Sequence, residues 1–449
     1  LQEFQTNAYD HGFQASIRII KKTFGNDVFT ELDVPEESLK VVGNGCVAQV
    51  LVGNTNKQKL IAIKVIHPGI RDSITADIRI LQYATWFVET YIPGVHNWSL
   101  VESVNEFESL MMSQLDMVEE GKSLDRFRAN FHNSGNKKSG KHYNGSSSGD
   151  NGIAEHVVFP KPLWPYVTQN VLVETFESGI PCSDMLGFVE NSIDMKLENN
   201  DNSIPPLSVS LSGNQEVRKE VAQIGVNAFL KMIFEDNFVH GDMHPGNILI
   251  RCTEGQENSS VDTSPYVEMV ILDAGIVSEL DPSDKQNLFD LFKAIARNGG
   301  DEAARLMINR STWNSAQLEL LRTRLTDSGS RPVKENPNSI REPDIFCAEM
   351  KVLVNEIHEH GIFLGRISIG NLLERVLMLC RQHNVKLDAK FIQIVVAIGI
   401  VEGLGKRFDP EMDILGKAIP YIVKATVADN MDWSLRKRNR EVVPKRNLE

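Results

Sequence analysis

Hydrophobic and polar residues alternate in two short segments near the beginning of the chain, which is the pattern of half-buried β-strands. These segments are residues 49–52 and 60–66, and the turn-rich stretch between them is typical of a hairpin. An apolar run over residues 171–176 predicts another strand. Further along, residues 248–251 and 267–272 predict a second hairpin, whose turn is lengthened by a polar insert.

Apolar residues at helical spacing dominate the remainder of the chain. They predict a long helix from about Leu100 to Phe131, a second helix over residues 217–233, and an amphipathic helix from about Asp284. The apolar run from Phe391 to Val401 is shorter than the roughly 18 residues of a membrane span, so we expect a buried helix there. Polar stretches rich in Gly, Ser and Asn predict flexible inserts at residues 132–152, 190–215 and 253–265.

The composition is that of a globular protein with a large core. The chain has 449 residues, 41% of them hydrophobic, which is enough for two lobes. Its formal net charge of −13 disfavours nucleic acid as a partner, because phosphate backbones require basic surfaces. The five cysteines are scattered without C-x-x-C spacing, which indicates a reducing compartment and no structural zinc. Cys46 is either a reactive thiol or, more commonly, a small apolar residue.

Candidate chemistry is concentrated in two polar segments of the second half. The first is the octapeptide His240–Asn247, and the second is Asp273-Ala274-Gly275, which follows an apolar run. An Asp, an Asn five positions later, and then Asp-X-Gly is the pattern of kinase-fold phosphotransferases. In that pattern Asp242 accepts a hydroxyl proton or orients the nucleophile. Asn247 and Asp273 hold the Mg²⁺ ions that bridge the phosphates of ATP.

The other parts of a kinase nucleotide site lie upstream in the expected order. A G-x-G-x-x-A-x-V segment is typical of a nucleotide loop, in which glycines allow the backbone to approach phosphates closely. The strand that follows carries Lys64 in the sequence I-A-I-K, which predicts a contact with the α- and β-phosphates. The candidate loop residues are Gly43, Asn44, Gly45, Cys46, Val47, Ala48, Gln49 and Val50.

A phosphate-binding lysine needs a carboxylate partner, normally from a helix behind the strand. Asp116 and Glu120 are four residues apart in the predicted long helix and would share one face. We therefore predict that Glu120 pairs with Lys64 and that Asp116 lines the same site. Taken alone, two such carboxylates more often form a solvated acidic face. The ordered motifs around them favour the site.

Two further segments leave alternatives open. Residues 173–176 are predicted to form the hinge that reads the adenine edge, which makes Glu174 and Phe176 nucleotide-binding candidates; the alternative is an ordinary core strand. His240 and His244 are four apart and raise the possibility of zinc. They lie on a loop with Pro and Gly instead of a helix, so a bracing role for His240 is favoured.

Together these residues resemble the UbiB/ADCK family of aarF-domain-containing atypical kinases. The resemblance extends from about Gly43 to Asp413. The family's E-x-D-x-x-x-E-x-x-N signature is matched by Gln114, Asp116, Glu120 and Ser123. Its H-x-D-x-H-x-G-N loop is matched by His240, Asp242, His244, Gly246 and Asn247. Its V-E-G…D-P stretch is matched by Val401, Glu402, Gly403, Asp409 and Pro410.

Several positions depart from the family pattern. Gly43–Cys46 stands where the family has an alanine-rich loop, Ala274 replaces the Phe of D-F-G, and Gln114 replaces the first Glu of the acidic signature. These departures are most similar to the second mammalian paralogue type of the family. The family's K-x-G-Q motif is not in the sequence, and the chain begins at Leu1 without Met, so we expect a piece of a longer protein.

The resemblance implies an α+β, two-lobed kinase-like fold, with an N-lobe of small antiparallel sheet and helices over residues 1–176 and a mostly helical C-lobe over 177–449. It also implies ATP and Mg²⁺ as cofactors, a role in coenzyme Q biosynthesis, and a mitochondrial location. The basic tail, residues 435–446, predicts either contact with anionic lipid or a solvated end.

The substrate class follows from the short segment after Gly275. Little room remains there for a peptide-docking activation segment, which favours a small molecule, a lipid or plain ATP hydrolysis. Two other functions stay open. The H-G-D-x-H-P-G-N loop is also that of aminoglycoside- and choline-kinase-like enzymes, and Gln114 and Ala274 lend weight to a non-enzymatic ATP-binding scaffold.

Overall fold

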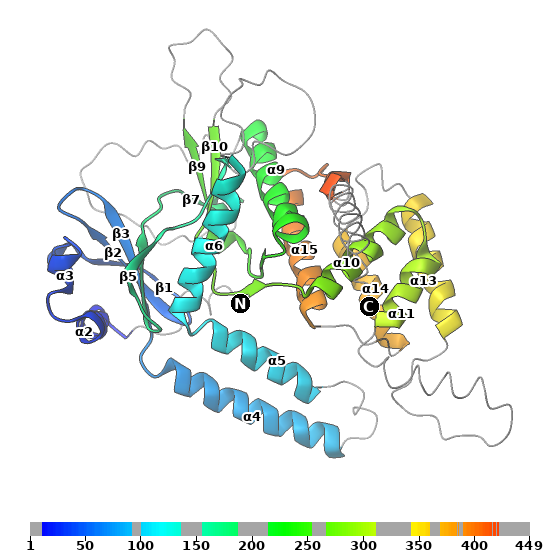
Figure 1. The fold of residues 1–449 in the computed structure, drawn as a ribbon, viewed down its shortest axis with the longest axis horizontal. Helices are drawn as coiled ribbons and strands as arrows, with labels where there is room; N and C mark the ends of the chain where they lie inside the picture. Colours follow the sequence, from blue (N-terminus) through cyan, green and yellow to red (C-terminus); the bar gives the residue numbers. More distant parts are fainter. Residues whose placement is uncertain are drawn as a thin grey trace, which may run out of the picture. The chain divides into compact units, whose positions relative to one another are not determined.

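The computed structural model describes residues 11–91, 100–135, 155–186, 214–253, 266–310, 343–359, 369–383, 385, 389–414, 416–418 and 420–421 (Figure 1). These residues form two compact units. The first contains the described residues up to 221 together with 240–277, and the second contains 222–239 and the described residues from 278 onward. The predicted lobe boundary at Phe176 therefore falls inside the first unit.

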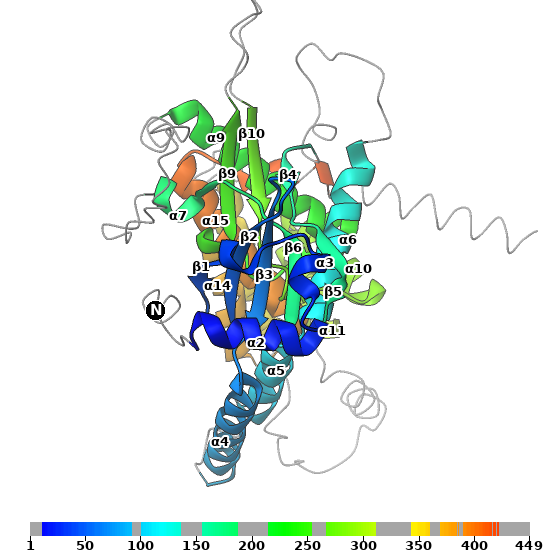
Figure 2. The same cartoon turned by 90° about the vertical axis from the view of Figure 1, so that its left-hand side faces the viewer.

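The first unit is built on a five-stranded antiparallel sheet with the order β1-β2-β3-β6-β5 (Figure 2). The strands are β1 Lys40–Asn44, β2 Ala48–Asn54, β3 Leu60–Ile66, β5 Pro162–Val167 and β6 Val171–Thr175. The first predicted hairpin is confirmed, since β2 pairs with β3 and places Val50 opposite Lys64. The strand predicted over 171–176 is confirmed as β6.

The two faces of this sheet differ because side chains alternate along each strand. Ile61, Ile63 and Val65 of β3 lie in a buried hydrophobic cluster with Ile17 and Ile20 of helix α2, Phe13–Phe24. The short helix α3, Val28–Glu31, completes this cover (Figure 2). Lys64 lies between Ile63 and Val65 along β3, so its side chain is on the other face of the sheet, toward helix α6, Met117–Gly135.

Three helices occupy the chain between β3 and the next strands. They are α4 Ile70–Tyr91, α5 Leu100–Ser113 and α6, and α4 and α5 lie side by side (Figures 1 and 2). The prediction of one helix from Leu100 to Phe131 is wrong, because the helix is interrupted at residues 114–116. Asp116 there accepts a hydrogen bond from the Val118 N–H at 2.9 Å and caps α6.

A second sheet in the first unit delivers the two candidate catalytic segments. Its order is β4-β10-β9-β7, with β4 Val157–Val158, β7 Ile180–Pro181, β9 Ile248–Thr253 and β10 Tyr266–Ile271. The second predicted hairpin is confirmed, since β9 pairs antiparallel with β10. Ile248 lies opposite Ile271, so Asn247 immediately before β9 and Leu272 immediately after β10 come together. Short strands β8 Val239–His240 and β11 Val277–Ser278 flank these segments.

The second unit is helical. Its helices are α10 Pro282–Ala296, α11 Gly300–Arg310, α13 Pro343–Glu359, α14 Ile369–Gln382 and α15 Ala389–Phe408. Helix α11 packs against α10 and α13, and α14 packs against α15. The helix predicted from about Asp284 is confirmed as α10. The helix predicted over 217–233 is confirmed as α9, Gln215–Lys231, which continues into a π-helical turn at Met232–Asp236.

The apolar run Phe391–Val401 lies in α15, which is buried on one side and exposes Ile392, Val396 and Ile400 on the other. Among the described residues, no helix combines the length and apolar character that crossing a membrane requires. All five cysteines are free thiols. The predicted inserts and the basic tail lie outside the described residues, except that α6 continues to Gly135 and α9 begins at Gln215.

Candidate active site

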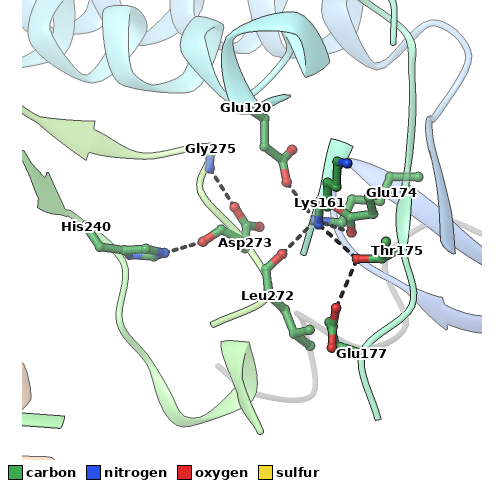
Figure 3. Close-up of polar contacts among 10 residues, drawn as sticks. Glu120, Lys161, Glu174, Thr175, Glu177, His240, Leu272, Asp273 and Gly275 are labelled. Carbon is green, nitrogen blue, oxygen red and sulfur yellow. Dashed lines mark hydrogen bonds and ion pairs between the residues drawn. The ribbon is translucent and has the colours of Figure 1, made fainter. Parts of the chain in front are cut away.

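The site is centred on the ammonium group of Lys64, on β3. Its Nζ lies 2.6 Å from Glu120 Oε1, 2.9 Å from the Leu272 carbonyl oxygen and 3.3 Å from Glu174 Oε1. The predicted pairing of Lys64 with Glu120 is therefore confirmed. Figure 3 shows Glu120, Glu174 and Leu272 converging from three elements: α6, β6 and the end of β10.

Helix α6 connects this centre to both catalytic segments. Glu120 lies in its first turn, one turn after the Asp116 cap, and also receives a hydrogen bond from the Ala274 backbone. Seven residues further, on the same face, the buried Phe127 lies with its ring centroid 5.9 Å from that of His240. A single rigid helix thus positions the lysine partner and packs against the catalytic loop.

The centre holds more buried carboxylates than cations. Burial disfavours the Lys64 ammonium, but Glu120, Glu174 and Asp273 outweigh burial and raise its pKa above the ordinary value. Burial raises the pKa of Glu120 and raises that of Glu174 to about 8, against the opposing attraction of Lys64. Burial opposes ionisation of Asp273 too, yet Lys64 and the Gly275 amide lower its pKa overall. One ammonium therefore faces three buried acids.

His240 braces the catalytic loop, as predicted. Its ring is buried, and its Nε2–H donates to the Asp273 carbonyl oxygen (Figure 3). Its Nδ1 accepts from the Asp242 N–H at 3.1 Å. Burial lowers its pKa. Both ring nitrogens thus have partners, which leaves no lone pair for a zinc ion. Among the described residues, no group of three or more His, Cys, Asp and Glu side chains is arranged to hold a metal ion.

Backbone pairing joins the predicted magnesium residues. The Leu272 N–H donates to the Asn247 carbonyl oxygen at 2.9 Å, next to Asp273. The Asn247 Nδ2 lies 3.4 Å from the Asp242 carbonyl oxygen, which orients the amide, and the Gly275 N–H donates to Asp273 Oδ1 at 2.7 Å. The Asp242 carboxylate is partly exposed, with Oδ2 3.8 Å from His244 Nε2. The predicted metal and catalytic residues thus belong to one hydrogen-bonded cluster.

The predicted nucleotide loop connects β1 to β2 and is supported from behind. Gln49 is fully buried, accepts a hydrogen bond from Ser16 Oγ at 2.7 Å, and donates to Asn44 Oδ1 at 2.9 Å. Gln49 was predicted to face the nucleotide with the rest of the loop. Its side chain is engaged instead with helix α2 and with Asn44, so it shapes the loop.

These contacts extend through two histidines and back to the nucleotide loop, and we call the whole set the polar ring. Ser16 Oγ lies 2.8 Å from His11 Nε2, and His11 Nδ1 lies 2.6 Å from His67 Nδ1. The His67 Nε2–H donates to the Gly45 carbonyl oxygen at 2.9 Å. Gly45 directly follows Asn44 in the nucleotide loop. The polar ring therefore consists of His11, Ser16, Asn44, Gly45, Gln49 and His67.

The hinge prediction for residues 173–176 needs a correction. β6 lies between β3 and β5, so its backbone is paired on both edges. The Thr175 N–H donates to the Lys161 carbonyl oxygen at 2.9 Å and the Phe176 N–H to that of Leu60 at 3.2 Å. These amides are not available to an adenine edge. Glu174 enters the site through its side chain instead, with the carboxylate beside Lys64.

Sequence reasoning missed several residues of the site. His11, Ser16 and His67 were not predicted, and neither was the Leu272 carbonyl. Ser16 gave a signal, because a serine on the apolar face of a helix is buried only with a hydrogen-bond partner. His67 directly follows the lysine strand and is fully buried. The partners of both come from distant parts of the chain, which a pattern of spacing does not reveal.

Two family models and several curated proteins match this chain. The model of the ABC1 atypical kinase-like domain matches residues 5–307, and that of the UbiB helical domain matches residues 356–413. A probable serine/threonine-protein kinase of Dictyostelium discoideum is 27% identical over 93% of this chain and 58% of its own length. A mitochondrial ABC1 family protein of Saccharomyces cerevisiae is 27% identical over 85% and 56%. A probable protein kinase UbiB of Vibrio cholerae is 26% identical over 92% and 61%.

This chain thus spans roughly half to three fifths of the length of the curated relatives it matches. The matched domains confirm the predicted α+β kinase-like fold and the predicted family resemblance. They also decide against an aminoglycoside- or choline-kinase-like assignment, which the catalytic loop alone had left open. Since the first domain covers more than half of the chain, the protein belongs to the ABC1/UbiB family of atypical kinase-like proteins.

Proposed function

We propose that this protein binds Mg-ATP and acts as an atypical kinase or ATPase. The observation that carries the proposal is the Lys64 ammonium, which Glu120 holds at 2.6 Å next to the Asp273 segment. A lysine held by a helix carboxylate beside a metal-binding Asp is what phosphoryl transfer requires of a kinase fold. In such a site catalysis rests on positioning and charge stabilisation.

The chemistry of the site fits magnesium. Mg²⁺ prefers oxygen ligands and is usually bound through one or two carboxylates together with phosphate oxygens. Asp273 and the Asn247 amide oxygen would hold it, and the three buried acids facing one ammonium make added positive charge favourable. When bound, the ion neutralises charge on the phosphates during transfer.

The residues of this chain then have separate tasks. Lys64 donates to phosphate oxygens while Glu120 keeps the ammonium in place. Asp242, whose carboxylate is partly exposed, accepts the proton of an attacking hydroxyl or orients a water. His240 holds the backbones of Asp242 and Asp273 in place through hydrogen bonds of its two ring nitrogens. The polar ring holds the nucleotide loop in shape.

The proposed substrate is a small molecule or a lipid, or water in an ATPase. Only six residues lie between Gly275 and the first residue of α10, Pro282, and they include the short strand β11, so a peptide-docking segment has little room. Relatives of the chain carry mitochondrial ABC1 and UbiB names. We propose on that basis a mitochondrial location. Support of coenzyme Q biosynthesis is proposed from the family resemblance, and peripheral contact with anionic lipid from the basic sequence of residues 435–446.

Purified protein tests the proposal. Mg-dependent thermal stabilisation by ATP and release of phosphate are measured with and without anionic vesicles, for the wild type, Asp273→Asn and Asp242→Asn. Asp301→Asn, at an exposed position of α11, is the matched control. We expect Asp273→Asn to lose the magnesium-dependent stabilisation and Asp242→Asn to bind ATP without turnover. Binding without turnover in the wild type under every condition would favour the scaffold, and absence of binding would reject the nucleotide site.

A further inference from the structure

The donors of Lys64 are fully used in this structure. An ammonium group has three N–H donors, and Nζ has three acceptors: Glu120 Oε1, the Leu272 carbonyl and Glu174 Oε1. A nucleotide phosphate can therefore reach Lys64 only if one acceptor gives way. Glu120 is held at 2.6 Å, and the Leu272 carbonyl belongs to a backbone paired with Asn247. Glu174, at 3.3 Å, is the weakest of the three.

Glu174 also carries an unused acceptor. Only 2% of the residue is exposed, and its Oε2 is buried without a hydrogen-bond partner in the described part of the chain. A carboxylate oxygen in this position loses its hydration without replacement, which is costly unless a proton or a ligand compensates. Glu174 lies opposite Ala62 in the sheet. Its side chain is on the same face of β6 as that of Leu172, two residues earlier, and Leu172 lies opposite Lys64. Its side chain therefore belongs to the lysine face of β6.

We propose that ionised Glu174 competes with nucleotide phosphate for the Lys64 ammonium, so that nucleotide binding is coupled to uptake of a proton by Glu174. This inference rests on the proposed function. When phosphate oxygen replaces Glu174 Oε1 on Nζ, the carboxylate loses its cation while it stays buried. It then takes one proton from solvent and becomes a neutral carboxyl group; no other bond forms or breaks.

The charges around Glu174 favour that proton. It faces Lys64 from β3, Glu120 from α6 and Asp273 from the segment after β10. Burial and the two acids favour the neutral form, Lys64 opposes it, and the pKa of Glu174 is raised to about 8. Below pH 8 the group is mostly neutral and competes little. Above pH 8 it is ionised and competes with phosphate.

Calorimetric titration with Mg-ADP at pH 6.5 and pH 9 tests the inference. The wild type is compared with Glu174→Gln, which keeps the shape and removes the charge, and with Glu119→Gln, an exposed position of α6, as the control. The nucleotide's own titration is the same for all proteins and cancels in the comparison. We expect equal affinities at pH 6.5. At pH 9 the wild type and the control should bind roughly tenfold more weakly than Glu174→Gln, the penalty for protonating a group of pKa about 8.

A second measurement counts the protons directly. Titrations of the wild type at pH 8.5 in two buffers with different ionisation enthalpies report protons taken up on binding. Uptake in the wild type that is lost in Glu174→Gln is the expected result. Normal binding with no uptake, or a Glu174→Gln affinity that follows the wild type at both pH values, overturns the inference and leaves the proposed function intact. Absence of Mg-ADP binding by the wild type overturns both.

Discussion

Two polar clusters of the first unit differ in the balance of their charges. The Lys64 centre gathers one ammonium and three acids, and leaves Glu174 Oε2 without a partner among the described residues. The polar ring gathers amide, hydroxyl and imidazole groups in five contacts of 2.6–2.9 Å, and the backbone between Asn44 and Gly45 completes it. Strand β3 links the two clusters, because it carries Lys64 and is followed directly by His67.

This difference in charge balance indicates a different role for each cluster. An excess of one charge is unfavourable in a buried site unless a ligand completes it, so the Lys64 centre is arranged for a charged ligand. Groups that already contact polar partners gain little from a ligand, but their contacts hold them in place. The contacts of the polar ring therefore support the loop, and the charge balance of the Lys64 centre agrees with the proposed Mg-ATP site.

Removing the lysine should produce the largest effect. Lys64→Met leaves Glu120, Glu174 and Asp273 buried without their cation, which is expected to cost about 3–5 kcal/mol of unfolding free energy and to abolish Mg-ATP binding. Urea unfolding at pH 8 measures the loss. Because protonation relieves carboxylate repulsion, the loss should shrink at pH 5.5. A loss that is equal at both pH values would show that the acids do not share the lysine's charge.

The next effect is a pH dependence of stability that originates at Glu174. Its pKa in the folded protein, about 8, is above the ordinary glutamate pKa of 4.5, so the folded state binds the proton more tightly than the unfolded chain does. The stability this provides is fully present below about pH 4.5 and is lost as pH rises through 8. We expect the wild type to lose on the order of a few kcal/mol across this range. Glu174→Gln should lose clearly less.

Urea unfolding of the two proteins from pH 5 to pH 8.5 measures this difference, with Glu119→Gln as the exposed control on α6. The control should follow the wild type. Parallel curves for the wild type and Glu174→Gln would mean that Glu174 does not retain its proton in the folded protein.

Breaking the polar ring should have a smaller effect, because no charge is left unpaired. Gln49→Leu removes the acceptor of the Ser16 hydroxyl and the donor to Asn44, which should cost about 1–3 kcal/mol. Since Asn44 is then free to move, Mg-ATP affinity should also fall. Gln286→Leu, at an exposed position of α10, is the matched control for urea unfolding and calorimetry. Unchanged affinity with lowered stability would confine the ring to a structural role.

The same contrast explains what the sequence could and could not predict. Lys64, Asp242, Asn247 and Asp273 were found because their chemistry requires particular residue types at particular spacings. Hairpins β2–β3 and β9–β10 were found because alternation and turn residues are local signals. The polar ring was missed because His11, Ser16 and His67 meet only when α2 packs behind β2 and β3.

The acidic helix shows where local patterns become ambiguous. Asp116 and Glu120 are four apart, which is equally compatible with two interior positions of one helix and with a cap followed by the first turn. The structure has the second arrangement. Glu174 was placed in a backbone-reading hinge, since alternation along β6 does not reveal that Lys64 on β3 is its neighbour.

The cap at Asp116 provides the smallest and most discriminating prediction. Asp116→Ala removes the acceptor of the Val118 N–H at the start of α6, which should cost about 1 kcal/mol of unfolding free energy. Asp116→Asn retains a capping oxygen without the charge and should recover most of that stability. Urea unfolding separates the two variants, and Mg-ATP titration tests whether Asp116 also lines the nucleotide site. If it only starts the helix that carries Glu120, affinity should follow stability and recover in Asp116→Asn. If its charge acts on the nucleotide, Asp116→Asn should restore stability and not affinity.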